Sequence, residues 1–115
     1  MNNLVVKIYV NTDSRKELEY LIEKMNFENK NSIEIDVVKN SNFNKSKAKE
    51  FPDGFLYFPL LIEYYSNEIK MSDINNTKII LNELWKNSIP AVASCSYEDE
   101  LPEKGGYKSK NVVWI

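Results

Sequence analysis

The chain has 115 residues, which fits one domain, and it contains no histidine. Imidazole is therefore absent as a general base, as the partner of a nucleophile and as a metal ligand, so we expect no enzyme, no metal site and no other cofactor. The single cysteine, Cys95, excludes an internal disulfide and a thiolate zinc site, and it fits a reducing compartment. The longest apolar run is too short to span a bilayer and no cationic, apolar leader precedes it, so we expect a cytoplasmic protein without membrane contact.

The first elements follow from hydrophobic periodicity. Apolar side chains alternate over residues 4–10, and this period of two predicts a strand with one apolar face. Ser14 and Glu17 match a capping box, and an apolar stripe at helical spacing follows them. These signals predict a helix over residues 15–27.

The next segment changes from a strand pattern to a polar, lysine-rich one. Residues 33–37 alternate again and predict a second, half-exposed strand. Residues 39–53 are polar and include Lys45, Lys47 and Lys49. This connection is long for a hairpin, so we expect either a functional segment or a short helix of its own.

The second half of the chain repeats the order of strand, helix and strand. Residues 55–65 are apolar on both faces, which predicts a central strand. Ser72 can cap a second helix, and Pro90 lies just beyond its end. Residues 91–97 predict a fourth strand, and residues 112–115 predict a short terminal one.

The order βαββαβ predicts a mixed α/β (α+β) fold, specifically a ferredoxin-like sandwich with a short C-terminal extra strand. We expect one domain over residues 1–115. In this topology the first and third strands are central and both helices cover one face of the sheet, which agrees with the strands that are most apolar on both sides.

An acidic cluster follows the fourth predicted strand. Carboxylates that point into water raise association rates and suppress wrong partners, so we predict a contact patch for a basic partner. The alternative is a solvated loop after an edge strand. Nearby Cys95 has no base to activate it, and we expect a buried structural thiol. The predicted patch consists of Glu98, Asp99, Glu100 and Glu103.

Aromatic residues on the sheet face away from the helices suggest a second binding mode. The segments Ile8-Tyr9-Val10-Asn11 and Gly54-Phe55-Leu56-Tyr57-Phe58 resemble the two short motifs of RNA-recognition domains, which implies an RNA-binding module that stacks bases on this face. Asp53 stands where that pattern has a basic residue, and a pI of about 5.2 argues against a nucleic-acid partner. A C-terminal strand, or a second subunit in a homodimer, is the alternative cover for these rings. The predicted face carries Tyr9, Phe55, Tyr57 and Tyr65, together with Glu34, Asp36 and Glu63.

In overall profile the chain resembles the immunity proteins of bacterial toxin systems, including those of contact-dependent growth inhibition. The features that carry this resemblance are a single small domain, the acidic cluster at residues 98–103 and the missing histidine. The resemblance implies a protein-binding protein that neutralises a cognate toxin, for example a nuclease domain, by forming a tight complex. The remaining alternatives are a small ligand-binding or homo-oligomeric regulatory domain, or a small enzyme without histidine. An acid–base group of such an enzyme would be a carboxylate among Asp53, Glu63, Asp99 and Glu100.

Overall fold

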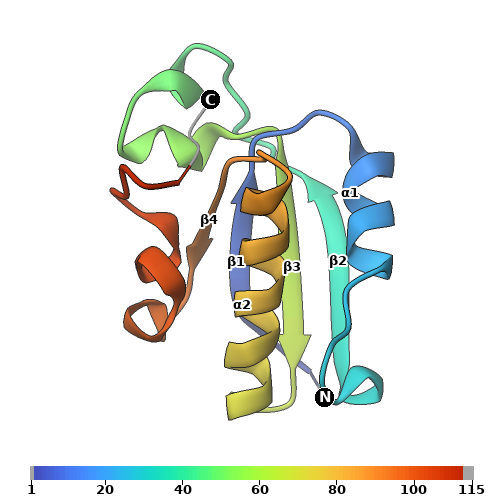
Figure 1. Cartoon of the computed structure of the whole chain (residues 1–115). Helices are drawn as coiled ribbons and strands as arrows, with labels where there is room; N and C mark the ends of the chain where they lie inside the picture. Colours follow the sequence, from blue (N-terminus) through green and yellow to red (C-terminus); the bar gives the residue numbers. More distant parts are fainter. Residues whose placement is uncertain (1, 113–115) are drawn as a thin grey trace.

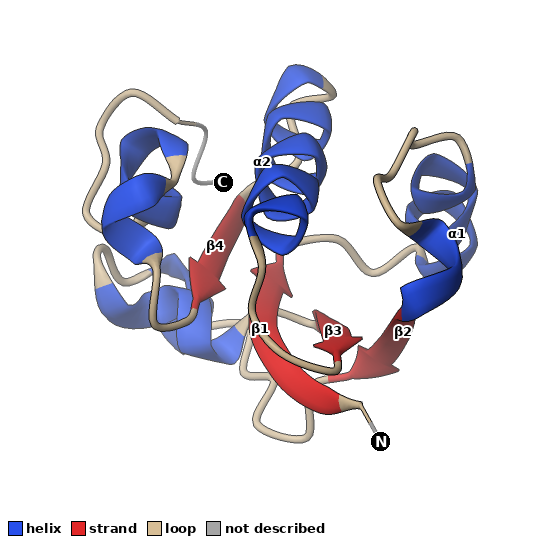
Figure 2. Ribbon diagram, turned by 90° about the horizontal axis from the view of Figure 1, so that it is seen from below, coloured by secondary structure: helices blue, strands red, loops and turns tan. Residues whose placement is uncertain are grey.

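The computed structural model describes residues 2–112 as a mixed α/β fold (Figure 1). Over these residues, four strands form one antiparallel sheet in the order β2-β3-β1-β4, so β1 and β3 are the central strands, as predicted. Both helices lie on one face of this sheet, which Figure 2 shows from below. Neither of the two is long and apolar enough to cross a membrane. The bounds are β1 (Asn3–Val10), α1 (Arg15–Glu23), β2 (Ile33–Lys39), β3 (Leu60–Ser66), α2 (Met71–Lys86) and β4 (Ala91–Ser94).

The main core lies between the helices and the sheet. Alternate residues of the central strands, including Ile8 and Ile62, are fully buried against this layer. Leu18 of α1 and Leu81 and Leu84 of α2 meet them with no exposed surface. Burial of each such side chain stabilises the fold by roughly 1.5–3 kcal/mol, so these rows fix the sheet face on which the helices pack.

A buried polar network joins β3 to α2. The Tyr64 hydroxyl donates to the Asp73 carboxylate over 2.7 Å and accepts from the Asn76 amide over 2.9 Å. The hydroxyls of Thr77 and Tyr97 lie 2.8 Å apart, which extends the network to the segment after β4. Burial raises the pKa of Tyr64, and its hydrogen bond to the carboxylate raises it further. The network satisfies polar groups that would otherwise be costly inside the core.

The helix ends differ in detail from the prediction. Ser14 caps α1, because the Glu17 backbone N–H donates to its Oγ over 3.3 Å, but the helix ends at Glu23 rather than at residue 27. The N-cap of α2 is Lys70, not Ser72. Asp73, three residues later, accepts from the Lys70 backbone N–H over 2.9 Å and so satisfies a donor at the start of the helix.

The predicted strand over residues 55–65 is wrong in its first half. Residues Asp53–Tyr57 form a 3-10 helix, and β3 begins only at Leu60. Gly54 packs against the backbone of residues 47–48, where a Cβ would lie 2.6 Å from the Lys47 carbonyl oxygen. This close approach of two neighbouring stretches of backbone holds the segment in a compact turn despite its strand-like pattern.

The last predicted strands are also shorter or outside the described chain. The fourth strand ends at Ser94 instead of residue 97, and Glu98–Glu100 form a 3-10 turn after it. Of the predicted terminal strand, Val112 lies in a bend, and residues 113–115 lie outside the described residues.

Candidate functional site

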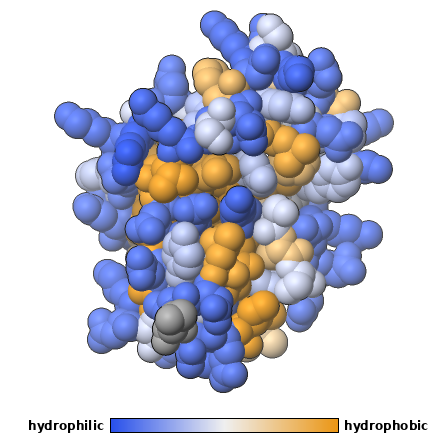
Figure 3. All heavy atoms as spheres, turned by 180° about the vertical axis from the view of Figure 1, so that it is seen from behind, coloured by the Kyte–Doolittle hydropathy of each residue, from blue (hydrophilic) through white to orange (hydrophobic). Residues whose placement is uncertain are grey.

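The sheet face opposite the helices is the candidate site, and we call it the open sheet face. Its side chains alternate with those of the core, so the pairing register places them in rows across the strands. Seen from behind, this side of the molecule shows hydrophobic side chains interrupted by hydrophilic ones (Figure 3). The residues on it are Leu4, Lys7 and Tyr9 of β1; Glu34, Asp36 and Val38 of β2; Leu61, Glu63 and Tyr65 of β3; and Val92 and Ser94 of β4.

One end of the open sheet face is covered by the chain itself. A second apolar cluster forms where the connection between β2 and β3 folds back onto Tyr9 and Val92. The Phe55 ring meets Tyr9 edge-on with centroids 5.2 Å apart, and Tyr107 on its other side at 5.6 Å. Phe55 is only 8% exposed, so its ring has no free face on which a base could stack.

The predicted aromatic residues are therefore brought together only in part. Tyr9, Phe55 and Tyr57 belong to this covered cluster, whereas Tyr65 lies on the uncovered part of the sheet. Within residues 2–112, the β2–β3 connection and Tyr107 cover these rings. The sequence pattern predicts a terminal strand or a second subunit as the cover, and residues 113–115 of that strand lie outside the described residues.

The uncovered end of the face is acidic. Asp36 of β2 lies directly opposite Glu63 of β3, and Lys7 of β1 lies opposite Glu63 on its other side. Glu34 lies opposite Tyr65 in the next row. Like charges placed directly opposite one another destabilise a sheet, so the Asp36 and Glu63 pair costs stability in the isolated protein.

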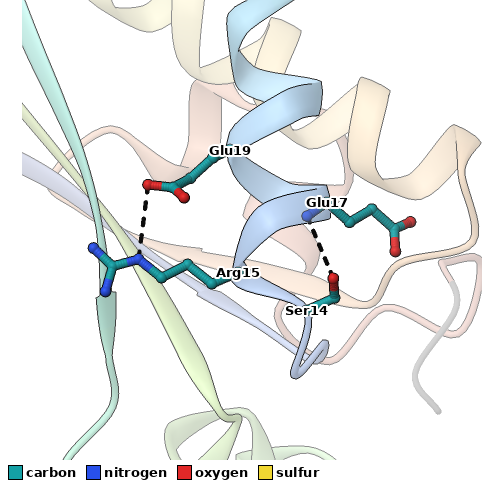
Figure 4. A network of polar contacts seen from close by, with 4 residues as sticks. All are labelled: Ser14, Arg15, Glu17 and Glu19. Carbon is teal, nitrogen blue, oxygen red and sulfur yellow. Dashed lines mark hydrogen bonds and ion pairs between the residues drawn. The ribbon is translucent and has the colours of Figure 1, made fainter.

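The pKa of Tyr65 reflects the same group of negative charges. Its hydroxyl donates to the Glu63 carboxylate over 3.1 Å, and this hydrogen bond is the main reason why the pKa of Tyr65 is raised. The charges of Glu63, Asp36 and Glu34 raise it further. Within residues 2–112 the one ion pair is elsewhere, between Arg15 and Glu19 of α1 at 3.7 Å (Figure 4).

A second group of carboxylates lies at the β4 end of the face. Asp53, Ser94, Glu98 and Tyr107 line a shallow pocket of about 230 Å³ together with Phe55. The Tyr107 hydroxyl donates to the Asp53 carboxylate over 2.8 Å, which raises the pKa of this tyrosine. Carboxylates thus lie along both the β2 side and the β4 side of the open sheet face.

The predicted acidic patch divides into two kinds of residue. Glu98 accepts a hydrogen bond from the Cys95 backbone N–H over 3.1 Å. Glu103 accepts from the side chains of Ser109 and Asn111, and these bonds lower its pKa. Asp99 and Glu100 are exposed, and within the described chain neither carboxylate has a hydrogen bond or ion pair. Within this patch, Asp99 and Glu100 are therefore the two carboxylates that are free to pair with a basic partner.

Cys95 is half-buried next to this patch. Burial is the main cause that raises the pKa of its thiol to about 11, and the charge of Glu98 adds to it. A protonated thiol is a poor nucleophile, so this environment fits a structural cysteine. Over residues 2–112, no group of three or more acidic or thiol side chains is arranged to hold a metal ion.

The lysine-rich connection contributes to a surface cavity with a volume of about 590 Å³. Lys45 and Lys49 line it beside Phe43, opposite the residues that join β1 to α1. Lys47 points elsewhere, since its ammonium lies 5.1 Å from the centre of the Tyr57 ring. The cavity could accommodate an anionic group beside an apolar one.

The sequence pattern predicts Glu34, Asp36 and Glu63 on this face. Alternation within a strand reveals which side chains share a face, and that signal was present. It does not reveal which residues of two strands lie opposite each other. The pairing of Asp36 with Glu63 is therefore visible only in the folded sheet.

Comparison of the chain with protein-family models, with curated protein sequences and with solved structures finds no match.

Proposed function

We propose that the chain binds a basic protein surface through the open sheet face, as an immunity protein that neutralises a cognate toxin. The observation that carries this proposal is the placement of Asp36 directly opposite Glu63, next to Glu34. Lys7 lies in the same row on the other side of Glu63, but within the described residues it forms no ion pair with these carboxylates. A partner that brings lysine or arginine to this face would convert the repulsion into attraction. Binding would then relieve a cost that the free protein carries.

The resemblance to immunity proteins supports the more specific part of the proposal. A nuclease toxin holds phosphates with cationic side chains, and the carboxylates of the open sheet face match such groups in charge. Long-range attraction between the two surfaces would also accelerate association at low salt. Neutralisation by binding needs no catalysis by this chain.

The proposal is tested with the product of the gene directly upstream, because immunity proteins are encoded next to their toxins. We expect a stoichiometric complex with the tagged chain that blocks the toxicity of that product. The double variant Glu34→Lys with Asp36→Lys should lose this complex. Glu83→Lys makes the same kind of charge reversal on α2, in the helix layer, and should retain it. Equal capture by both variants would contradict the proposed face.

The same capture experiment tests the acidic patch as a second part of the interface. Reversing Asp99 and Glu100 should weaken the complex without loss of folded structure, because both side chains are exposed. Glu98 is left unchanged in this variant, since its carboxylate holds the Cys95 backbone. If the complex is unchanged, the interface does not extend beyond β4.

We also propose a ferredoxin-like topology for the fold and a cytoplasmic location for the protein. The element order and the antiparallel strand order β2-β3-β1-β4 support the topology. The half-buried free thiol of Cys95 supports a reducing compartment. A homodimer is compatible with both, and sedimentation of the purified chain over a range of concentrations would detect it.

An RNA-binding function would have to use a different surface from the one that the sequence suggests. Phe43 is 49% exposed and stands beside Lys45 and Lys49 at the large cavity. Aromatic stacking next to cationic side chains is the chemistry of single-strand binding. Salt-dependent binding of a single-stranded RNA that is lost in Phe43→Ala, and kept in the Glu34→Lys and Asp36→Lys variant, would favour this function over the first.

A further inference from the structure

The two edges of the sheet are built differently. β4 has only four residues, and its edge is shielded by other parts of the chain. The Trp85 indole N–H donates to the Ala91 carbonyl oxygen over 3.0 Å. Gly106 lies so close to the same carbonyl that a Cβ on it would be 2.9 Å from the oxygen. Shielding of this kind prevents another strand from pairing at the edge.

β2 forms the opposite edge and lacks such shielding. It has seven residues and no proline, and over residues 2–112 no further strand pairs with its outer side. The Asn40 backbone N–H donates to the Pro59 carbonyl over 2.9 Å, which continues the register with β3. Since hydrogen-bonded and non-hydrogen-bonded pairs alternate along an antiparallel ladder, the N–H and C=O groups of Ile35 and Val37 point away from β3. These groups are available to an added strand.

A groove runs beside this edge, between β2 and α1. One section has a volume of about 310 Å³, and a second section of about 260 Å³ continues toward the start of the strand. Figure 4 shows Arg15 and Glu19 on the side of α1 that reaches toward this strand. The groove is lined by apolar side chains of both elements and by charged ones, which come from α1 and also include Asp36 and Lys30. Its lining includes Ile22, Glu23 and Ile35 in both sections, with Phe27 and Ile33 in the second.

We propose that the free edge of β2 accepts one extended strand of the basic partner, which pairs with the backbone of Ile35 and Val37. This inference rests on the proposed function and adds the mode of binding. Side chains of an added strand alternate between the two sheet faces. Lysine or arginine at every second position would lie next to Glu34 and Asp36, and apolar side chains between them would enter the groove beside Ile22.

Charge favours this occupant over a second copy of the chain paired through the middle of β2. An antiparallel pair of β2 strands centred on Asp36 would place two copies of this carboxylate directly opposite each other. Centring the pair on Ile35 would place Glu34 opposite Asp36, which is no better. Like charges in these positions are destabilising, whereas a basic strand relieves them.

The test uses two synthetic nine-residue peptides with the same composition. In the first, lysine and valine alternate; in the second, the lysines and valines stand in two blocks. Nuclear magnetic resonance of the full chain follows the backbone amide exchange of Ile35 and Val37. We expect the alternating peptide to slow exchange at both amides and the block peptide to leave it unchanged, because only the first can pair as a strand with one charged face.

A matched pair of variants separates backbone pairing from side-chain packing. Ile35→Pro removes the outward N–H but leaves the hydrogen bonds to β3 intact, because they come from neighbouring residues. Ile35→Ala removes comparable side-chain packing and keeps the N–H. We expect Ile35→Pro to weaken binding of the alternating peptide by about tenfold or more, and Ile35→Ala by about threefold at most.

Other outcomes overturn the edge site and can be told apart. If the alternating peptide binds and shifts the signals of Glu63 and Tyr65 but Ile35→Pro does not weaken it, the face binds basic chains without strand addition, and the proposed function stands. If neither peptide binds, the edge site is rejected, while capture of the upstream gene product still decides the proposed function. If the free protein protects the Ile35 and Val37 amides increasingly with concentration, the edge belongs to a second copy.

Discussion

Replacing Asp36 with lysine should make the protein more stable and at the same time weaken partner binding. In the folded sheet Asp36 lies directly opposite Glu63, so the substitution converts a pair of like charges into a pair of opposite ones. Cross-strand charge pairs contribute roughly 0.2–1 kcal/mol in either direction, and both side chains are partly or fully exposed. After allowance for screening by solvent, we expect the free energy of unfolding to rise by about 0.5–1 kcal/mol.

The assay is urea unfolding followed by circular dichroism at low and high salt. The gain should shrink in high salt, because the interaction is electrostatic and near the surface. Glu34→Lys is the matched control, since it reverses the same charge on the same face opposite Tyr65 instead of a carboxylate. It should weaken binding as much as Asp36→Lys but give a smaller change in stability. A loss of stability in Asp36→Lys, or an equal gain in Glu34→Lys, would refute the reasoning.

Three further predictions concern the scaffold that holds this face. Tyr64→Phe should lower the free energy of unfolding by about 2–3 kcal/mol, because it leaves the buried Asp73 carboxylate without the hydroxyl that donates to it over 2.7 Å. Urea unfolding should show a much smaller change for Tyr65→Phe, and equal changes would mean that the network does not stabilise the fold. Gly106→Ala should lower the free energy of unfolding by about 1–3 kcal/mol and the thermal midpoint by several degrees, because its φ of 96° disfavours a side chain and the neighbouring carbonyl leaves no room for one. An unchanged midpoint would show that the shielded edge tolerates movement. The folded state holds the Cys95 proton more tightly than the unfolded state, in which the pKa of the thiol is near 9.0. The stability that the protonated thiol contributes is therefore complete below pH 9.0 and should be lost as the pH rises toward about 11. The free energy of unfolding should fall less steeply over this range in Cys95→Ala, and identical slopes would contradict the burial of the thiol.

The amino-acid sequence by itself determined the element order and most of the side-chain orientations. Alternation over residues 33–37 placed the apolar face of β2 correctly, because the strand period depends only on the local backbone. In β1 it was right from Val6 to Val10 but wrong at Leu4, because a bulge between Leu4 and Val6 turns Leu4 onto the open sheet face, where it is 45% exposed. Apolar residues at helical spacing, Leu81 and Leu84 among them, likewise lie on the buried face of α2. The absence of histidine restricts the available chemistry in the same way whatever the fold.

Only the tertiary structure decided how these elements meet. The pattern at residues 55–59 predicted a strand, but the close approach of Gly54 to the backbone of residues 47–48 holds this segment in a turn that covers the sheet. The register of β2 against β3 brings Asp36 and Glu63 together, and it also leaves the backbone of Ile35 facing outward. The register joins residues far apart in the chain, and so does the packing of Phe55 on Tyr9 that seats the turn on the sheet. Local periodicity specifies which side chains share a face, and it carries no information about which neighbour that face or edge will meet.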